Sequence, residues 1–140
     1  MTKFLIAISF LLFVGSPFAN AEQVYYCTSE FSIGIKKDKK IGKWKSTGFE
    51  VQRYTIKFSY DFSKLNGLDK TNWTCKTPYP LWDKYDHIVV CYQEHDAGSV
   101  FMFDSRTNRF TYGNINIFGY LGAIKDPDSD AIVAGTCQKF

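Results

Sequence analysis

The stretch that decides the fold is Val100–Tyr112, VFMFDSRTNRFTY, which predicts a β-hairpin. Residues 105–108 form a four-residue loop between two runs that alternate large apolar with smaller or polar side chains. Opposite charges and aromatic pairs that face each other across two antiparallel strands stabilise such a hairpin. The predicted cross-strand pairs are Asp104 with Arg109, Phe103 with Phe110, and Phe101 with Tyr112.

A second hairpin is predicted upstream, where residues 54–60 alternate apolar and polar side chains. Phe49 and Val51 have the opposite parity, so a β-bulge is expected near residues 52–53. The strand then reaches Asn66–Gly67, the dipeptide typical of a two-residue type I′ turn. This turn predicts the pairs Leu65 with Leu68, Lys64 with Asp69, Tyr60 with Trp73, and Phe58 with Cys75.

The whole chain has the composition and pattern of an all-β protein. It contains 13 Phe, 9 Tyr and 3 Trp, residues that favour strands, and no stretch keeps helical apolar spacing over three turns. We therefore expect an antiparallel barrel or barrel-like sandwich of about eight strands, connected as an up-and-down meander. The further strands are predicted at residues 24–29, 31–36, 87–94, 115–121 and 131–140.

The N-terminus has the layout of a secretory signal peptide. Met1–Lys3 is positively charged, residues 4–14 are apolar, and Ala19–Ala21 is a small-x-small cleavage site. The apolar run is too short to span a bilayer, and no second one follows. We expect residues 1–21 to be removed and residues 22–140 to fold as a single β domain. That domain is expected to be exported, soluble, and periplasmic or secreted, without a transmembrane helix.

The four cysteines are expected to form two structural disulfides in an oxidising compartment. Sequence alone leaves three connectivities open. Strand placement favours Cys27–Cys137, between the first and last strands, and Cys75–Cys91, across the loop at residues 78–86. The absence of a CxxC motif and the wide cysteine spacing favour neither a redox pair nor a metal site, and no cofactor is expected.

Charge and motifs do not indicate an enzyme. The net charge is +3, which is too balanced to predict a nucleic-acid partner. His87 and His95 lie eight residues apart, roughly 26 Å along one strand, so the two do not form one site. No catalytic residue is assigned. The alternative is a small hydrolase, with phosphodiesters as the candidate substrate class, that uses His95 and Glu94 with a basic residue.

Two segments are candidate contact surfaces of a non-catalytic binding or structural domain of the cell envelope. The loop at residues 77–86 carries Tyr79, Trp82 and Tyr85, and its prolines limit its conformations, as suits an interface anchor. The segment at residues 36–45 is predicted as an exposed loop that can contact an anionic surface. Its lysines are Lys36, Lys37, Lys39, Lys40, Lys43 and Lys45. The partner itself is not indicated.

Short motifs at the start, in the middle and at the end of the mature chain resemble those of small exported bacterial proteins of unknown function. These motifs are Tyr26–Cys27, residues 109–112 (RFTY) and residues 135–140 (GTCQKF). The chain is also similar to periplasmic inhibitors of c-type lysozyme, which are small eight-stranded barrels with a cysteine in the first and last strands. The resemblance implies that architecture and, as a further alternative, a lysozyme-inhibitor-like role. The Ser-Gly-x-x-Tyr motif of the inhibitory loop does not occur here.

Overall fold

The computed structural model describes residues 21–78, 83–93, 98–115 and 130–140. These residues form strands and one short 3₁₀ helix, η1. No helix among them is long and apolar enough to cross a membrane. The predicted signal peptide falls on residues 1–20, outside the described part, and stays a prediction. The elements are β1 Gln23–Lys37, β2 Trp44–Gly48, β3 Arg53–Phe58, β4 Lys64–Asn66, β5 Trp73–Lys76, η1 Asp83–Tyr85, β6 Ile88–Gln93, β7 Ser99–Asp104, β8 Arg109–Asn114 and β9 Asp130–Lys139.

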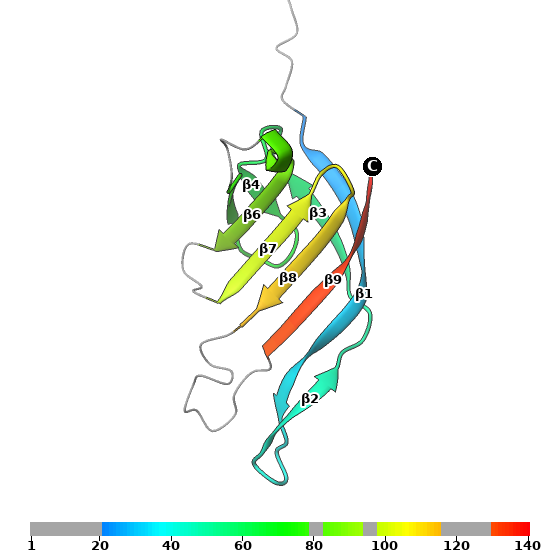
Figure 1. The fold of residues 1–140 in the computed structure, drawn as a ribbon, viewed down its shortest axis with the longest axis vertical. Coiled ribbons are helices and arrows are strands. Elements are labelled where there is room, and N and C mark those ends of the chain that lie inside the picture. Colours follow the sequence, from blue (N-terminus) through cyan, green and yellow to red (C-terminus); the bar gives the residue numbers. More distant parts are fainter. Residues whose placement is uncertain (1–20, 79–82, 94–97, 116–129) are drawn as a thin grey trace, which may run out of the picture.

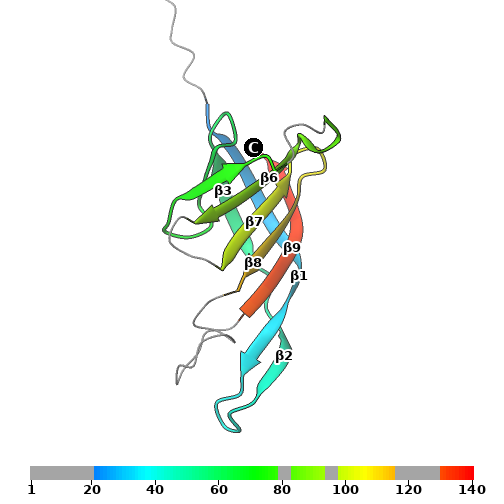
Figure 2. The same cartoon turned by 60° about the vertical axis from the view of Figure 1, so that its left-hand side comes forward.

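The strands form a closed antiparallel barrel, as the sequence predicts (Figure 1). From β3 to β9 each strand pairs with the next, and β9 returns to pair with β1. One edge of β1 pairs with β3 in its first half and with β2 in its second half. Strand β2 is therefore an addition to the eight-stranded barrel. Figures 1 and 2 both show that β2 and the end of β1 project beyond the ends of β8 and β9.

The hairpin of β7 and β8 has the predicted register. Asp104 pairs with Arg109, Phe103 with Phe110, and Phe101 with Tyr112. The turn is built from side chains that suit it. Asp104 Oδ1 accepts hydrogen bonds from the backbone N–H groups of Arg106, at 2.8 Å, and Thr107, at 3.2 Å. Asn108 has a φ of 55°, a conformation that Asn tolerates better than most residues.

The predicted two-residue hairpin at Asn66–Gly67 is wrong. Strand β3 already ends at Phe58, and Leu65 pairs with Phe58 on one side and Trp73 on the other. The chain turns earlier because the Asp61 carboxylate accepts hydrogen bonds from Ser59 and Ser63 and closes a turn there.

Gly67 has a different role from the one that the dipeptide predicts. Its φ is +96°, and a Cβ there would lie 2.1 Å from the carbonyl oxygen of Thr55. Glycine is therefore needed for a close approach of a loop to β3, not for a two-residue turn. Tyr60, predicted to pair with Trp73, lies beyond the end of β3 and is 64% exposed.

The predicted strands 24–29 and 31–36 are one continuous strand, β1, with a register shift between Ser29 and Phe31. The bulge expected near residues 52–53 is not there, because β3 begins at Arg53. An extra residue lies instead in β1, at Glu30 in its pairing with β9, and it reverses which β1 side chains face inward. Tyr25, Cys27 and Ser29 are buried, whereas Phe31 and Ile33 are exposed.

The other predicted elements differ in outcome. Strands β6 and β9 lie where residues 87–94 and 131–140 predict them, within two residues at each end. Most of the predicted strand 115–121 falls outside the described residues. The predicted loop at residues 36–45 is instead the end of a hairpin, in which Lys36 pairs with Lys45 and Lys37 with Trp44. Cross-strand pairing therefore extends into the lysine-rich segment.

Both predicted disulfides are present and join residues that face each other across paired strands. Cys27–Cys137 fastens β1 to β9, and Cys75–Cys91 fastens β5 to β6. They close segments of 110 and 16 residues, for which the chain-entropy description gives about 4.8 and about 3 kcal/mol. All four cysteines are thus used structurally.

Aromatic side chains fill the barrel around these disulfides. The ring of Tyr25 lies 4.9 Å from that of Phe103 and 5.9 Å from that of Phe58, both edge-on. The rings of Phe101 and Phe110 stack at 5.5 Å. Centroid distances in this range are favourable for aromatic pairs and add to the hydrophobic burial of each ring.

Candidate functional site

The barrel interior is a packed core at the level of the disulfides. Phe58, Leu65 and Phe101 have no exposed surface, and the indole of Trp73 is 1% exposed. The indole N–H donates to Asp69 Oδ1 at 3.3 Å, so its polar atom is satisfied as well. Side chains therefore fill this part of the interior, and the candidate site lies on the outer wall of the barrel.

A contiguous set of exposed apolar side chains lies on the outer wall, over β7, β8, β9 and β1. Their exposed fractions range from 39% to 67%, although each side chain is large and apolar. Exposed apolar patches of this kind mark interaction surfaces, whereas single exposed apolar residues do not. We call this surface the outer apolar face; it comprises Phe31, Ile33, Val100, Met102, Ile115 and Ile132.

Strand pairing brings these residues together. Val100 pairs with Gly113, Gly113 with Ile132, and Ile132 with Ile33. Directly paired residues point to the same side of a sheet, so these form one row across four strands. A second row runs through Met102 and Phe31 by way of Thr111 and Ala134. The outer apolar face is therefore set by strand register and does not depend on a loop.

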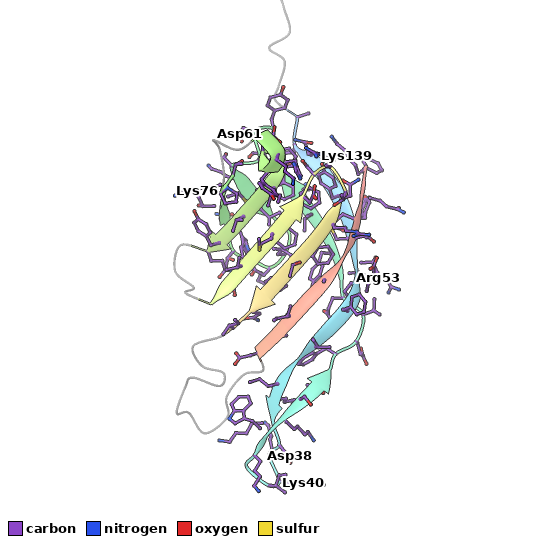
Figure 3. All side chains as sticks on the ribbon, in the orientation of Figure 1. Asp38, Lys40, Arg53, Asp61, Lys76 and Lys139 are labelled. Atoms are coloured by element: carbon purple, nitrogen blue, oxygen red, sulfur yellow. A yellow bond between two sulfur atoms is a disulfide. The ribbon has the colours of Figure 1, made fainter. Side chains whose placement is uncertain are left out.

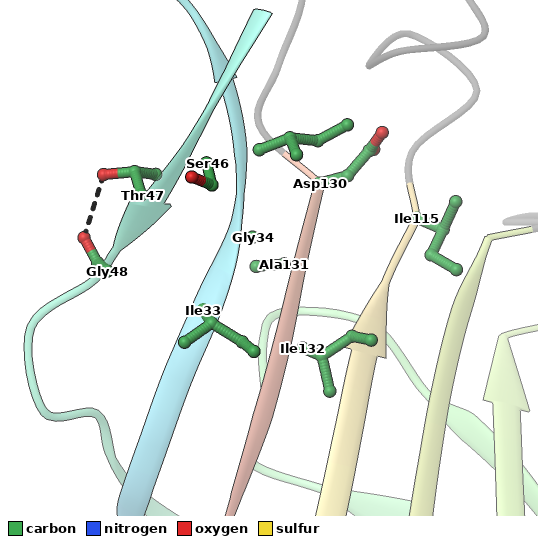
Figure 4. A pocket seen from close by; sticks show the side chains of 10 residues that line it. Ile33, Gly34, Ser46, Thr47, Gly48, Ile115, Asp130, Ala131 and Ile132 are labelled. Atoms are coloured by element: carbon green, nitrogen blue, oxygen red, sulfur yellow. Dashed lines mark hydrogen bonds between the residues drawn. The ribbon is translucent and has the colours of Figure 1, made fainter.

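A cleft of about 730 Å³ adjoins this face, between the projecting hairpin and β9 (Figure 4). In the close-up, Ile33 and Ile132 extend from neighbouring strands, with Ile115 farther along the same wall. Gly34 lies in its floor, where a Cβ would be 2.0 Å from the carbonyl oxygen of Asp130. The lining residues are Ile33, Gly34, Ile35, Ser46, Thr47, Gly48, Ile115, Asp130, Ala131 and Ile132.

The chemistry of the cleft favours apolar ligands. Its lining is mainly aliphatic, with two hydroxyl side chains and one carboxylate. The hydroxyl of Thr47 donates to the backbone carbonyl of Gly48 at 3.1 Å, and Asp130 is only 8% exposed. A mainly apolar cleft with few polar groups binds apolar side chains or ligands and uses the polar groups for orientation.

A second group, around His87, lies at the opposite end of β7 from the cleft. His87 Nδ1 is 3.4 Å from an oxygen of Asp86, and Nε2 is 3.7 Å from an oxygen of Asp104. Burial favours a higher pKa for Asp104, but backbone hydrogen bonds from Arg106 and Thr107, with the nearby His87, bring the net pKa below its ordinary value. These contacts place the His87 ring near one carboxylate just before β6 and another at the end of β7.

This group does not have the geometry of an acid–base site. Both contacts of the His87 ring exceed ordinary hydrogen-bond lengths, and Nδ1 is buried without a hydrogen bond to any described residue. The nearby Arg106 guanidinium lies 3.9 Å from Asp86, and both side chains are mostly exposed. The group therefore contains a histidine, two carboxylates and an arginine, but these side chains do not converge on one point where a substrate could react.

The predicted site residues are only partly within the described chain. Tyr79 and Trp82 lie outside it, as do Glu94 and His95. Tyr85 is half-buried at the end of η1, with Lys84 Nζ 5.6 Å from its ring centre. Among the described residues, no group of three His, Cys, Asp or Glu side chains is arranged to hold a metal ion.

Sequence reasoning missed the outer apolar face, although a signal was present. In an exposed antiparallel sheet, alternate residues are polar, whereas residues 100–103 (VFMF) and 131–134 (AIVA) are apolar on both faces. A continuous apolar run indicates that both sides of the strand meet apolar surroundings. The inner side chains of these strands pack into the core, and the apolar side chains on the outer side are exposed to solvent.

The comparisons with known protein families, curated proteins and solved structures gave no match to this chain.

Proposed function

We propose that this protein is an exported, non-catalytic binding domain of the cell envelope that contacts its partner through the outer apolar face. The observation that carries the proposal is the row of exposed apolar residues Val100, Ile132 and Ile33, aligned across paired strands beside an apolar cleft. Exposing these side chains to water is unfavourable, and burial against a partner relieves that cost.

The packed interior supports a surface role. A lipocalin-like carrier would need an open interior, but Phe58, Phe101 and Trp73 occupy the barrel at the level of the disulfides. The structural disulfides also fix the strands that carry the face, because Cys27–Cys137 joins β1 directly to β9. A rigid surface loses little conformational entropy on binding.

The proposal is tested by photocrosslinking with the oxidised mature domain, residues 22–140. A photoreactive phenylalanine analogue replaces Ile132, on the outer apolar face, or Lys64, an exposed residue of β4 on the opposite wall. After incubation with envelope extract, we expect a discrete adduct from position 132 and none from position 64. The adduct should weaken when Ile33→Asn is added to the position 132 variant.

Equal adducts from both positions, or none from position 132, would contradict the proposed contact surface. Far-UV circular dichroism and thermal unfolding of each variant establish that the barrel is intact before crosslinking.

A further inference from the structure

We propose that the end of the β1–β2 hairpin docks on an anionic phospholipid surface. In this arrangement its lysines contact the headgroups and Ile41 enters the interface between headgroups and acyl chains. The proposal concerns residues 36–45, which we call the lysine arm. It goes beyond the proposed function, and it holds or fails independently of the outer apolar face.

The lysine arm projects from the barrel. Lys36 pairs with Lys45 and Lys37 with Trp44, and residues 38–43 form the connection between the strands. Figure 3 shows Asp38 and Lys40 at the far end of the molecule from Asp61 and Lys139. A flat membrane can therefore meet this end without contacting the barrel wall.

The positive charge of the protein is concentrated in this arm. Its six lysines and one aspartate give a formal charge of +5, whereas the whole chain has +3. The remainder of the chain is therefore net negative. A local cluster of four to eight basic residues favours anionic membranes by about 1 kcal/mol for each lysine close to the surface.

The turn of the arm is held in one conformation by Asp38. Its Oδ1 accepts a hydrogen bond from the backbone N–H of Lys40 at 2.9 Å, and its Oδ2 is 2.9 Å from Lys45 Nζ. The backbone N–H of Gly42 donates to the Asp38 carbonyl at 2.8 Å, and the φ of Gly42 is +69°. The one carboxylate of the arm is thus engaged within the turn, and the geometry is set before any ligand binds.

Ile41 distinguishes a lipid surface from other polyanions. It lies in the turn between Lys40 and Gly42 and is 66% exposed. A soluble polyanion gains nothing from an exposed isoleucine, whereas a bilayer can bury it. Stable association with membranes generally requires two signals, such as a basic patch combined with apolar insertion, and the arm carries both.

The test is co-sedimentation of the oxidised mature domain with phospholipid vesicles. We expect binding to vesicles that contain about 30% phosphatidylglycerol, little binding to phosphatidylcholine alone, and loss of binding in high salt. The double variant Lys40→Ser/Lys43→Ser should weaken partitioning by roughly tenfold or more. Adding Ile41→Ser to this double variant should weaken partitioning further. The charge-conserving variant Lys40→Arg/Lys43→Arg should partition like the unsubstituted protein.

The matched control is Lys64→Ser/Lys76→Ser, which removes the same charge from exposed residues of β4 and β5. If this control weakens binding as much as the arm variant, the effect is net charge and the proposal is wrong. Equal binding to neutral and anionic vesicles would also overturn it. Binding to heparin that requires the arm, without binding to vesicles, would assign the arm to soluble polyanions instead.

Discussion

Both halves of β1 pair antiparallel with β9, with a register shift between them, but their apolar side chains differ in exposure to water. In the first half, Tyr25, Cys27 and Ser29 are at most 4% exposed and face the aromatic core. In the second half, Phe31 and Ile33 are 67% and 62% exposed. A single bulged residue, Glu30, separates the halves and reverses the direction of the apolar side chains.

The inner side of the second half explains why its apolar residues are not core residues. Gly34 pairs with Ala131, which pairs with Asn114, which pairs with Ser99. This inner row is small or polar, whereas Tyr25, an inner residue of the first half, contacts the rings of Phe58 and Phe103. The aromatic core thus occupies one end of the barrel, and at the other end the apolar residues are on the outside. In this comparison the first half of β1 contributes to the buried core, and the second half carries part of the face that we propose as a contact surface.

The largest expected effect concerns the disulfide of the first half. Replacing Cys27 and Cys137 together by Ser removes the bridge between β1 and β9 and should lower the free energy of unfolding by about 4–5 kcal/mol. The Cys75–Cys91 disulfide closes a shorter segment, so replacing both of its cysteines by Ser should lower the free energy of unfolding by about 3 kcal/mol. Urea unfolding of both variants measures the difference. If the free energy of unfolding falls less without Cys27–Cys137 than without Cys75–Cys91, the first half of β1 is not the main source of stability.

A pair of identical substitutions compares the two halves directly. Phe58→Ala empties space against Tyr25, in the first half, and should lower the free energy of unfolding by about 3–5 kcal/mol. Phe31→Ala, in the second half, removes an exposed ring and should change it by no more than about 0.5 kcal/mol. Denaturant unfolding measures both. An equal cost for the two substitutions would show that Phe31 belongs to the core and not to a contact surface.

The elements that sequence predicted well are those specified by neighbouring side chains. The register of β7 and β8 follows from one charge pair and two aromatic pairs around a short loop, and the structure has it. The disulfide pairing follows from closure of the barrel, which places the first and last strands side by side.

The elements that sequence did not predict depend on contacts far along the chain. Glycine is needed at position 67 because the chain passes close to the backbone of Thr55, and a rule based on the Asn-Gly dipeptide alone does not predict this contact. The bulge is in β1, at Glu30 in its pairing with β9, and the local parity of residues 49–54 carries no information on that pairing. The outer apolar face needs the register of four strands at once, so only its apolar runs are visible in the sequence.

The smallest expected effect is on acid stability and separates the barrel from the lysine arm. Hydrogen bonds from the side chains of Ser59 and Ser63 lower the pKa of Asp61 to about 2, from an ordinary 3.8. The hydrogen bond from Lys45 lowers the pKa of Asp38. A carboxylate whose pKa is lowered on folding stabilises the folded state above its unfolded pKa. That contribution is lost as the pH falls through the folded pKa.

Asp61→Asn should therefore lower the melting temperature near pH 5, and the difference from the unsubstituted protein should shrink between about pH 4 and pH 2. Asp38→Asn should leave the melting temperature nearly unchanged, because no residue of the arm belongs to the buried core, but amide exchange at residues 38–43 should become faster. Thermal unfolding at several pH values and hydrogen exchange measure the two effects. A global loss of stability from Asp38→Asn would mean that the arm is part of the cooperative fold. It would contradict the view that the arm and the barrel are energetically independent.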